Sequence, residues 1–207
     1  LRPIAAILDE QGDEIFREAD SISLEIDMDK EVVKRTFALA EKYGKPIYAV
    51  VSNMSIAVER RDFMRSVHCF ICNQQEAGIL FSENYDDVTP EEMLETLQMK
   101  IRGAQISRMV VTMGAQGAVF ATLDGESGWC PAKKVDVKDT TGAGDAFFAG
   151  VVIGQTYGKS MMESCEIGTR LAASVITTGE NVCPRFLPSE FGLDAPELDD
   201  AQLALEF

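Results

Sequence analysis

The segment from Asp139 to Gly150 combines residue types that could carry out chemistry at one place. Gly142 and Gly144 stand where a helix is predicted to begin, with only Ala143 between them. The first amides of a helix have no partner inside the helix and carry positive partial charge, so this bare backbone can hold an anion. Asp145 follows in the first turn, where a carboxylate can accept a proton from a hydroxyl group. The segment therefore predicts a base beside an anion hole, an arrangement suited to phosphoryl transfer.

Two upstream segments place polar side chains and glycines directly after predicted buried strands. The first runs from Asn73 to Glu76, and the second runs from Thr112 through Gly114 to Gly117. Ligand sites gather at the carboxyl ends of parallel strands, and glycines allow close approach of the backbone. Taken alone, the first segment is by default a solvated first helical turn, and a hairpin turn explains the second equally well.

Apolar runs alternate with amphipathic stretches along the chain, and this alternation predicts the elements that position these segments. An α/β domain with a mainly parallel sheet, covered by helices on both faces, is expected. No linker or internal repeat divides the chain, so one domain is predicted over residues 1–207. Strands are predicted at 4–8, 46–51, 67–72, 107–113 and 117–121, and helices at 31–43, 56–66, 73–81, 89–102, 142–157 and 160–177.

Composition excludes several classes of protein. The chain has 207 residues, of which 46% are apolar and 26% charged, which is typical of a globular protein. A net charge of −15 argues against nucleic-acid binding through a basic face. There is no run of eighteen apolar residues and no signal or transit peptide at the start of the chain, so a cytoplasmic protein without a membrane span is expected.

The cysteines are five in number and lack the spacing of a disulfide framework, which predicts free thiols. Cys69 and Cys72 have the CxxC spacing, but no second pair or nearby histidine completes a metal site. Core packing is favoured for both residues. A redox or metal protein that uses them is the alternative, and it predicts bound zinc or a thiol of low pKa.

The string from Asp139 to Gly150 resembles, nearly letter for letter, the second signature of the PfkB family of ribokinase-like carbohydrate kinases. The two upstream segments resemble the N-x-x-E element and the T-x-G-x-x-G turn of the same family, in the same order. The resemblance implies a ribokinase-like fold. It also implies transfer of the γ-phosphoryl group of ATP to a primary hydroxyl of a sugar or nucleoside, with Mg²⁺ as the metal.

The resemblance assigns roles residue by residue. Asp145 is implied as the catalytic base, and Gly142, Ala143 and Gly144 as the anion hole. Asn73 and Glu76 are implied to hold Mg²⁺ largely through water, as this ion keeps several of its waters. Nucleotide contacts are implied for Asn73, Thr112, Gly114, Gly117, Thr177 and Gly179, with helix-end capping as the competing account of the last two, and a monovalent cation such as K⁺ is implied near Asp139 and Thr141.

The resemblance is convincing from about Ala19 to Pro184, and family members are usually longer at the N-terminus. We expect the N-terminal part of the family fold to be missing, a loop near residue 14 to be shortened, and residues 1–13 to be a strand of the small β-sheet lid. Relatives of this kind often pair through their lid sheets, so a homodimer is a further expectation.

The acceptor is left open by the sequence. Gly125 to Trp129 resembles a segment of pseudouridine kinases, although a turn with a packed tryptophan explains it nearly as well. Ribose, fructose and ordinary nucleosides are equally allowed. The alternative function is a nucleotide- or sugar-binding regulator with the same fold, which would bind its ligand without forming ADP.

Overall fold

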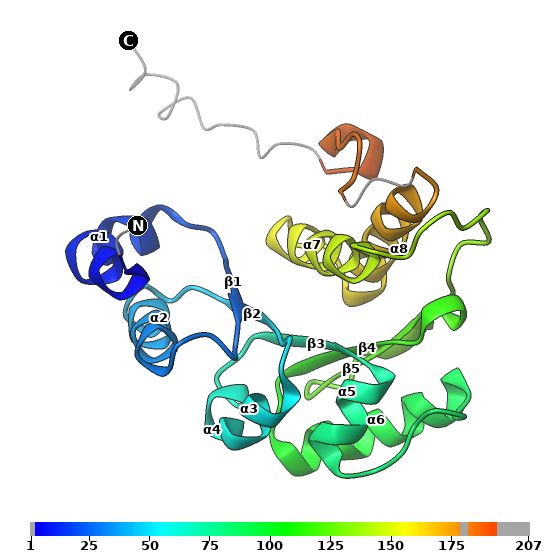
Figure 1. Ribbon diagram of the computed structural model, residues 1–207, viewed down its shortest axis with the longest axis horizontal. Helices are drawn as coiled ribbons and strands as arrows, with labels where there is room; N and C mark the ends of the chain where they lie inside the picture. Colours follow the sequence, from blue (N-terminus) through cyan, green and yellow to red (C-terminus); the bar gives the residue numbers. More distant parts are fainter. Residues whose placement is uncertain (1–2, 179–181, 194–207) are drawn as a thin grey trace.

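The computed structural model describes residues 3–178 and 182–193, and its centre is one six-stranded sheet (Figure 1). The strands lie side by side in chain order. The first four are parallel, whereas the last two are antiparallel to their neighbours. They are β1 (Ile22–Glu25), β2 (Ile47–Val50), β3 (Cys69–Asn73), β4 (Arg108–Thr112), β5 (Ala118–Thr122) and β6 (Ser127–Cys130).

Helices cover both faces of the sheet, as predicted (Figure 1). Crossovers between parallel strands are almost always right-handed, so strands laid down in chain order keep their connecting helices on one face. That face is covered by α2 (Lys30–Tyr43), α3 (Met54–Glu59), α4 (Arg61–Met64), α5 (Gln74–Phe81) and α6 (Pro90–Ala104). The opposite face is covered by α7 (Ala143–Thr156) and α8 (Met161–Ile176).

The core that packs on the sheet lies in two layers, one on each side. In β3, Phe70 and Cys72 belong to the layer under α2–α6, whereas Cys69 and Ile71 belong to the layer under α7 and α8. Successive side chains of a strand point to opposite faces, so a strand covered on both sides must be apolar throughout. This burial explains the unbroken apolar runs that the sequence shows at the central strands.

Cys69 and Cys72 therefore point to opposite faces of the sheet and cannot bind one ion together. Burial raises the pKa of the Cys69 thiol to about 12 and raises that of Cys72 well above its ordinary value. Within the described residues, no three metal-ligating side chains gather at one place. These observations argue against the redox or metal alternative and in favour of core packing.

The lid strand predicted within residues 1–13 is wrong, because residues 4–13 lie in the helix α1 (Ile4–Glu18). Gly12 and Phe16 are buried on one side of this helix. An added Cβ at Gly12 would lie 2.6 Å from Leu39 Cδ1, so α1 packs closely on α2. The five-residue apolar run that suggested a strand also fits a helix, since short runs carry no decisive period. All strands of the described residues belong to the central sheet, so the lid on which pairing was expected is not among them.

Two smaller predictions also need correction. The helix expected over residues 56–66 is broken at Arg60 into α3 and α4. The Arg60 side chain donates to the backbone carbonyls of Ile26 and Met28, so it fastens this break to the loop after β1. The strand β6 was not predicted, because Ser127 and Gly128 give it no apolar alternation. In the described part of the chain, no helix has the length and apolar character needed to cross a membrane.

Candidate active site

The helix α7 begins with unpaired backbone amides. Gly142 takes the position before its first residue with a left-handed φ of 80°, and no side chain caps the helix. Ala143 N donates to Thr140 O at 3.2 Å, but the amides of Gly144 and Asp145 have no acceptor within the described residues. The Asp145 side chain is exposed. The N-terminus of α7 therefore presents open donors with a carboxylate in the same turn, which can receive an anion and a proton respectively.

The loop that enters α7 is held at two points. Asp139 Oδ1 accepts from Thr141 N at 2.9 Å and from Thr141 Oγ1 at 2.8 Å, and these bonds hold the pKa of Asp139 below its ordinary value. Lys138 N donates to Ile176 O at 2.8 Å, which ties the loop to the last turn of α8. The first turn of α7 is thus fixed relative to the end of α8.

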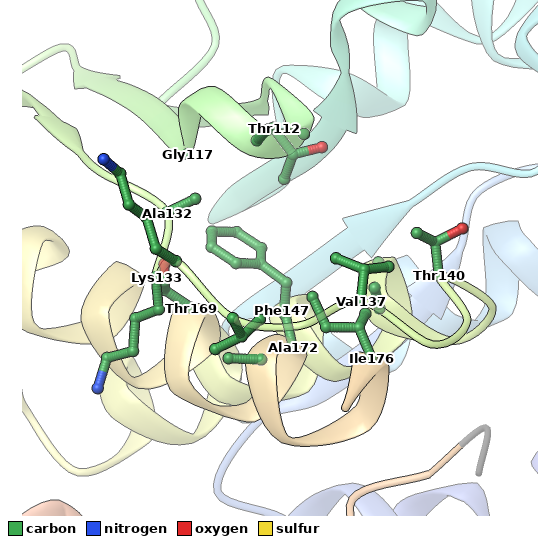
Figure 2. A pocket seen from close by; sticks show the side chains of 17 residues that line it. Thr112, Gly117, Ala132, Lys133, Val137, Thr140, Phe147, Thr169, Ala172 and Ile176 are labelled. Atoms are coloured by element: carbon green, nitrogen blue, oxygen red, sulfur yellow. The ribbon is translucent and has the colours of Figure 1, made fainter. Parts of the chain in front are cut away.

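A cavity of about 530 Å³ adjoins these amides (Figure 2). Its walls come from the β4–β5 turn, from residues 132–140, and from α7 and α8. Lys133 and Thr140 lie at opposite ends of it, and the Phe147 ring points from α7 toward the β4–β5 turn (Figure 2). Cavities of this size, largely apolar and with a few polar groups at the rim, are typical of small-molecule sites.

The β4–β5 turn is both a hairpin turn and a wall of the cavity. Met113 N donates to Gly117 O at 2.7 Å and closes the turn. Gly114 and Gly117 have φ values of 55° and 99°, which favour glycine. An added Cβ at Gly117 would lie 2.1 Å from Cys130 O, so only glycine fits here. The two interpretations that the sequence left open for this segment are therefore compatible.

The Asn73–Glu76 segment caps α5. Asn73 Oδ1 accepts from Glu76 N at 2.9 Å, and Glu76 Oε2 accepts from Asn73 N at 2.8 Å. Partial burial raises the pKa of Glu76, although the hydrogen bonds to Asn73 oppose that shift. Neither residue lines the cavity, but the sheet register places Asn73 directly beside Thr112, which does.

The predicted residues fall into three groups. Five line the cavity, namely Thr112, Gly114, Gly117, Ala143 and Gly144. Six lie near it without lining it, namely Gly142, Asp145, Asp139, Thr141, Asn73 and Glu76. Thr177 follows α8 and donates from its hydroxyl to the carbonyls of Ala173 (3.0 Å) and Ser174 (3.1 Å), so helix-end capping accounts for it. Gly179 lies outside the described residues.

One wall of the cavity was missed entirely. Thr169, Ala172, Ala173 and Ile176 line it from α8. They recur at the three- and four-residue spacing of one helix face, so a face with small residues was visible in the sequence. That pattern fits close packing against another helix equally well, and it gave no separate sign of a cavity.

Comparisons with known proteins show which family the chain resembles over most of its length. A family profile described as "pfkB family carbohydrate kinase" matches residues 6–182. The chain is 34% identical over 164 residues to guanosine-inosine kinase of Exiguobacterium acetylicum, covering 78% of this chain and 53% of that protein. It is 26% identical over 145 residues to pseudouridine kinase of Escherichia coli K12, covering 68% and 44%.

Solved structures also resemble the fold of this chain. The crystal structure of a probable sugar kinase from Rhizobium etli CFN 42 matches with a TM-score of 0.73 at 25% identity, covering 90% of this chain and 58% of that one. The chain thus spans about half the length of the curated relatives it matches.

Proposed function

Since the chain belongs to the PfkB family of carbohydrate kinases, we propose that it carries the phosphoryl-transfer site of an ATP-dependent kinase whose acceptor is a primary hydroxyl of a nucleoside or sugar. The observation that carries this proposal is the open N-terminus of α7. There, unpaired amides, the Asp145 carboxylate and the cavity adjoin one another.

The cavity would hold the nucleoside part of ATP. Its apolar walls from α7 and α8 suit a base, and the amides of Gly144 and Asp145 suit the phosphates. Asn73 and Glu76 fit a role near Mg²⁺ through its waters, because the sheet register places Asn73 beside Thr112, which lines the cavity. A bound Mg²⁺ ion would supply positive charge against the phosphate oxygens.

In the reaction, Asp145 takes the proton of the acceptor hydroxyl as its oxygen attacks the γ-phosphorus. The new oxygen–phosphorus bond forms as the bond between the γ-phosphorus and the bridging oxygen breaks, and ADP leaves. The amides at the start of α7 stabilise the negative charge on the transferring group. Most of the rate enhancement comes from this positioning and from electrostatic stabilisation.

For the acceptor, we propose a purine nucleoside. The relative named guanosine-inosine kinase, at 34% identity, supports this choice over a simple sugar. The segment that resembled pseudouridine kinases has a structural explanation of its own. It forms the turn into β6, where the Trp129 indole donates to Gln116 O at 2.7 Å.

Replacement of Asp145 tests the proposal. We expect Asp145→Asn to bind ADP with unchanged affinity but to lose about 10²- to 10⁴-fold in turnover, because the base is gone while the amides remain. The measurement is ADP release with guanosine, inosine, pseudouridine and ribose as acceptors, together with ADP binding by calorimetry.

The matched control is Asp136→Asn. Asp136 is exposed in the same loop, does not line the cavity, and has no hydrogen bond or ion pair within the described residues. Its replacement should leave turnover within about twofold of the parent. Near-parental turnover in Asp145→Asn would refute the base assignment. ADP binding without turnover for any acceptor would instead favour a non-catalytic regulator.

A further inference from the structure

A second cavity, of about 300 Å³, lies beside the segments that lead into β3 and β4, whereas the first adjoins the end of β4. It is enclosed by α4, by the last turn of α5, and by the last turn of α6 with the residues that lead into β4. Its apolar wall is formed by Met64, Leu80 and Ile106, which are buried. It shares no lining residue with the first cavity. It is therefore a separate concave site whose residues have no part in the proposed transfer reaction.

The charge of this cavity is opposite to that of the molecule. Arg61 and Arg65 line it, and no carboxylate side chain does among the described residues. Arg61 Nη2 donates to Leu80 O at 2.7 Å, which fixes its guanidinium at the wall. Arg65 has no hydrogen bond, ion pair or ring contact within the described part of the chain. The neighbouring carboxylate of Glu83 is already bound by Lys100 and by the Tyr85 hydroxyl.

This arrangement is unusual for a chain with 34 acidic residues and a net charge of −15. Both arginines are exposed, so water can hydrate the Arg65 guanidinium, and its donors are free for a ligand. Here one guanidinium is held in place by a carbonyl, and a second lies at the same cavity without a partner. A concave site with two guanidinium groups and an apolar wall matches an organic anion.

We propose that this second cavity binds a small organic anion, a phosphate monoester or a carboxylate attached to a short apolar body. The anionic group lies against Arg61 and Arg65, and the Ser82 hydroxyl is available to donate a further hydrogen bond. The apolar body lies against Met64, Leu80 and Ile106. The volume of about 300 Å³ is at the lower end of the range for small-molecule sites, which limits the ligand to a compact one.

The proposal is tested by titrating the 207-residue protein with phenyl phosphate, benzoate and inorganic phosphate while backbone amide shifts are recorded by NMR. Ser82 and Gly103 report on the second cavity, whereas Gly144 and Asp145 report on the start of α7, so binding at the two places is distinguished. We expect saturable shifts at Ser82 and Gly103 with phenyl phosphate or benzoate. Phenyl phosphate should bind more tightly than inorganic phosphate, because only the former fills the apolar wall.

Variants then distinguish binding at a defined site from general attraction to surface charge. Arg65→Ala should weaken binding by about tenfold or more, because it removes a charge-assisted hydrogen-bond donor. Arg65→Lys should be intermediate, since an ammonium keeps the charge but not the planar donor pair. The matched control is Arg102→Ala, an exposed arginine in the last turn of α6 that does not line the cavity, with a change below about twofold.

The described contacts predict that Arg65→Ala folds normally, which a thermal melt checks. The proposal is overturned if no saturable shift occurs at Ser82 and Gly103 with either aromatic probe. It is also overturned if Arg65→Ala and Arg102→Ala weaken binding equally, because the attraction would then be general surface charge.

Discussion

Gly117 shows how single residues fix the wall of the first cavity. Its φ of 99° and the 2.1 Å approach of Cys130 O to an added Cβ exclude any side chain. We expect Gly117→Ala to lower the free energy of unfolding by about 2–4 kcal/mol, through backbone strain and through displacement of β6. Urea denaturation measures the change.

Gly125→Ala is the matched control for this clash. Gly125 has a similar φ of 104°, but an added Cβ there would meet nothing within 4 Å. Gly125→Ala should therefore lower the free energy of unfolding by about 1–2 kcal/mol, through backbone strain alone. Equal losses in the two variants would mean that the contact with Cys130 does not constrain the turn.

His68 makes the stability of the protein depend on pH. Its ring is partly buried, and Arg108 Nη1 lies 2.8 Å from Nε2. Burial and then the Arg108 charge lower the pKa of His68 below its ordinary value of 6.5. The unfolded chain therefore binds a proton more readily than the folded one, so the free energy of unfolding falls as the pH drops below about 6.5.

We expect His68→Gln to lose this part of the pH dependence. Urea denaturation at about pH 7 and about pH 5.5 should show a smaller difference in the variant than in the parent, because glutamine does not titrate. This window lies above the ordinary pKa values of aspartate and glutamate. The same difference in both proteins would show that His68 is not the group responsible.

Site residues could be predicted from the sequence where their position depends only on the neighbouring residues. Gly142 to Asp145 could be located because helix starts and free amides follow from the chain itself. Lys133 and Phe147 could not, because their place in the cavity depends on how the segment after β6 crosses α7 and α8. That crossing is a tertiary contact, and neither residue type distinguishes a cavity wall from an ordinary surface or core position.

At the scale of elements, α7 and α8 touch backbone to backbone. An added Cβ at Gly150 would lie 2.5 Å from Gly168 Cα, so the two glycines permit the contact. We expect Gly150→Ala to lower the free energy of unfolding by about 1–3 kcal/mol, because the helices must move apart. It should also weaken ADP binding, since α7 and α8 form the walls of the first cavity.

Gly103→Ala provides the comparison on another helix. An added Cβ at Gly103 in α6 would meet nothing within 4 Å, and the residue is exposed. Alanine should therefore stabilise the protein by about 0.5–1 kcal/mol. Differential scanning calorimetry measures whether the melting temperature falls in Gly150→Ala and rises in Gly103→Ala. Destabilisation by both would point to a general intolerance of helix substitutions instead of a specific contact.

The elements were predictable where start and stop signals are strong. The Thr89–Pro90 start of α6 and the Gly44 end of α2 are where the sequence placed them. A strand was predicted where α1 begins, because the clearest indication of a helix there is its pairing with α2. Asp9 and Asp13 are one helical turn apart and pair with Arg35 and Lys42 of α2, both at 2.6 Å. That match becomes visible only when the two helices are known to lie side by side.

At the scale of the whole molecule, the net charge of −15 opposes compactness. We expect the melting temperature to rise when choline chloride is increased from about 10 mM to about 150 mM, because the screening length falls from about 30 Å to about 8 Å. Choline is used because it would not bind at the monovalent-cation site that the family resemblance implies near Asp139. A constant or falling melting temperature would show that favourable ion pairs outweigh the repulsion.

The overall architecture was predictable because alternating apolar runs and helices allow few arrangements. Parallel β2–β4 with helices on both faces follow from that alternation, whereas β1, which is not among the predicted strands, and the antiparallel turn into β5 do not. Only the shortness of the β4–β5 connection, which is residues 113–117 with a 3₁₀ helix from Gly114 to Gln116, excludes a crossover there.

The contact between Gly150 and Gly168 makes α7 and α8 one stiff body. The loop at Lys138 is fastened to the end of α8, so it travels with them. The β4–β5 turn belongs to the sheet, which is a second body. Any change in the width of the gap that would receive ATP would therefore move both helices together and would disturb the core layer that they share with the sheet.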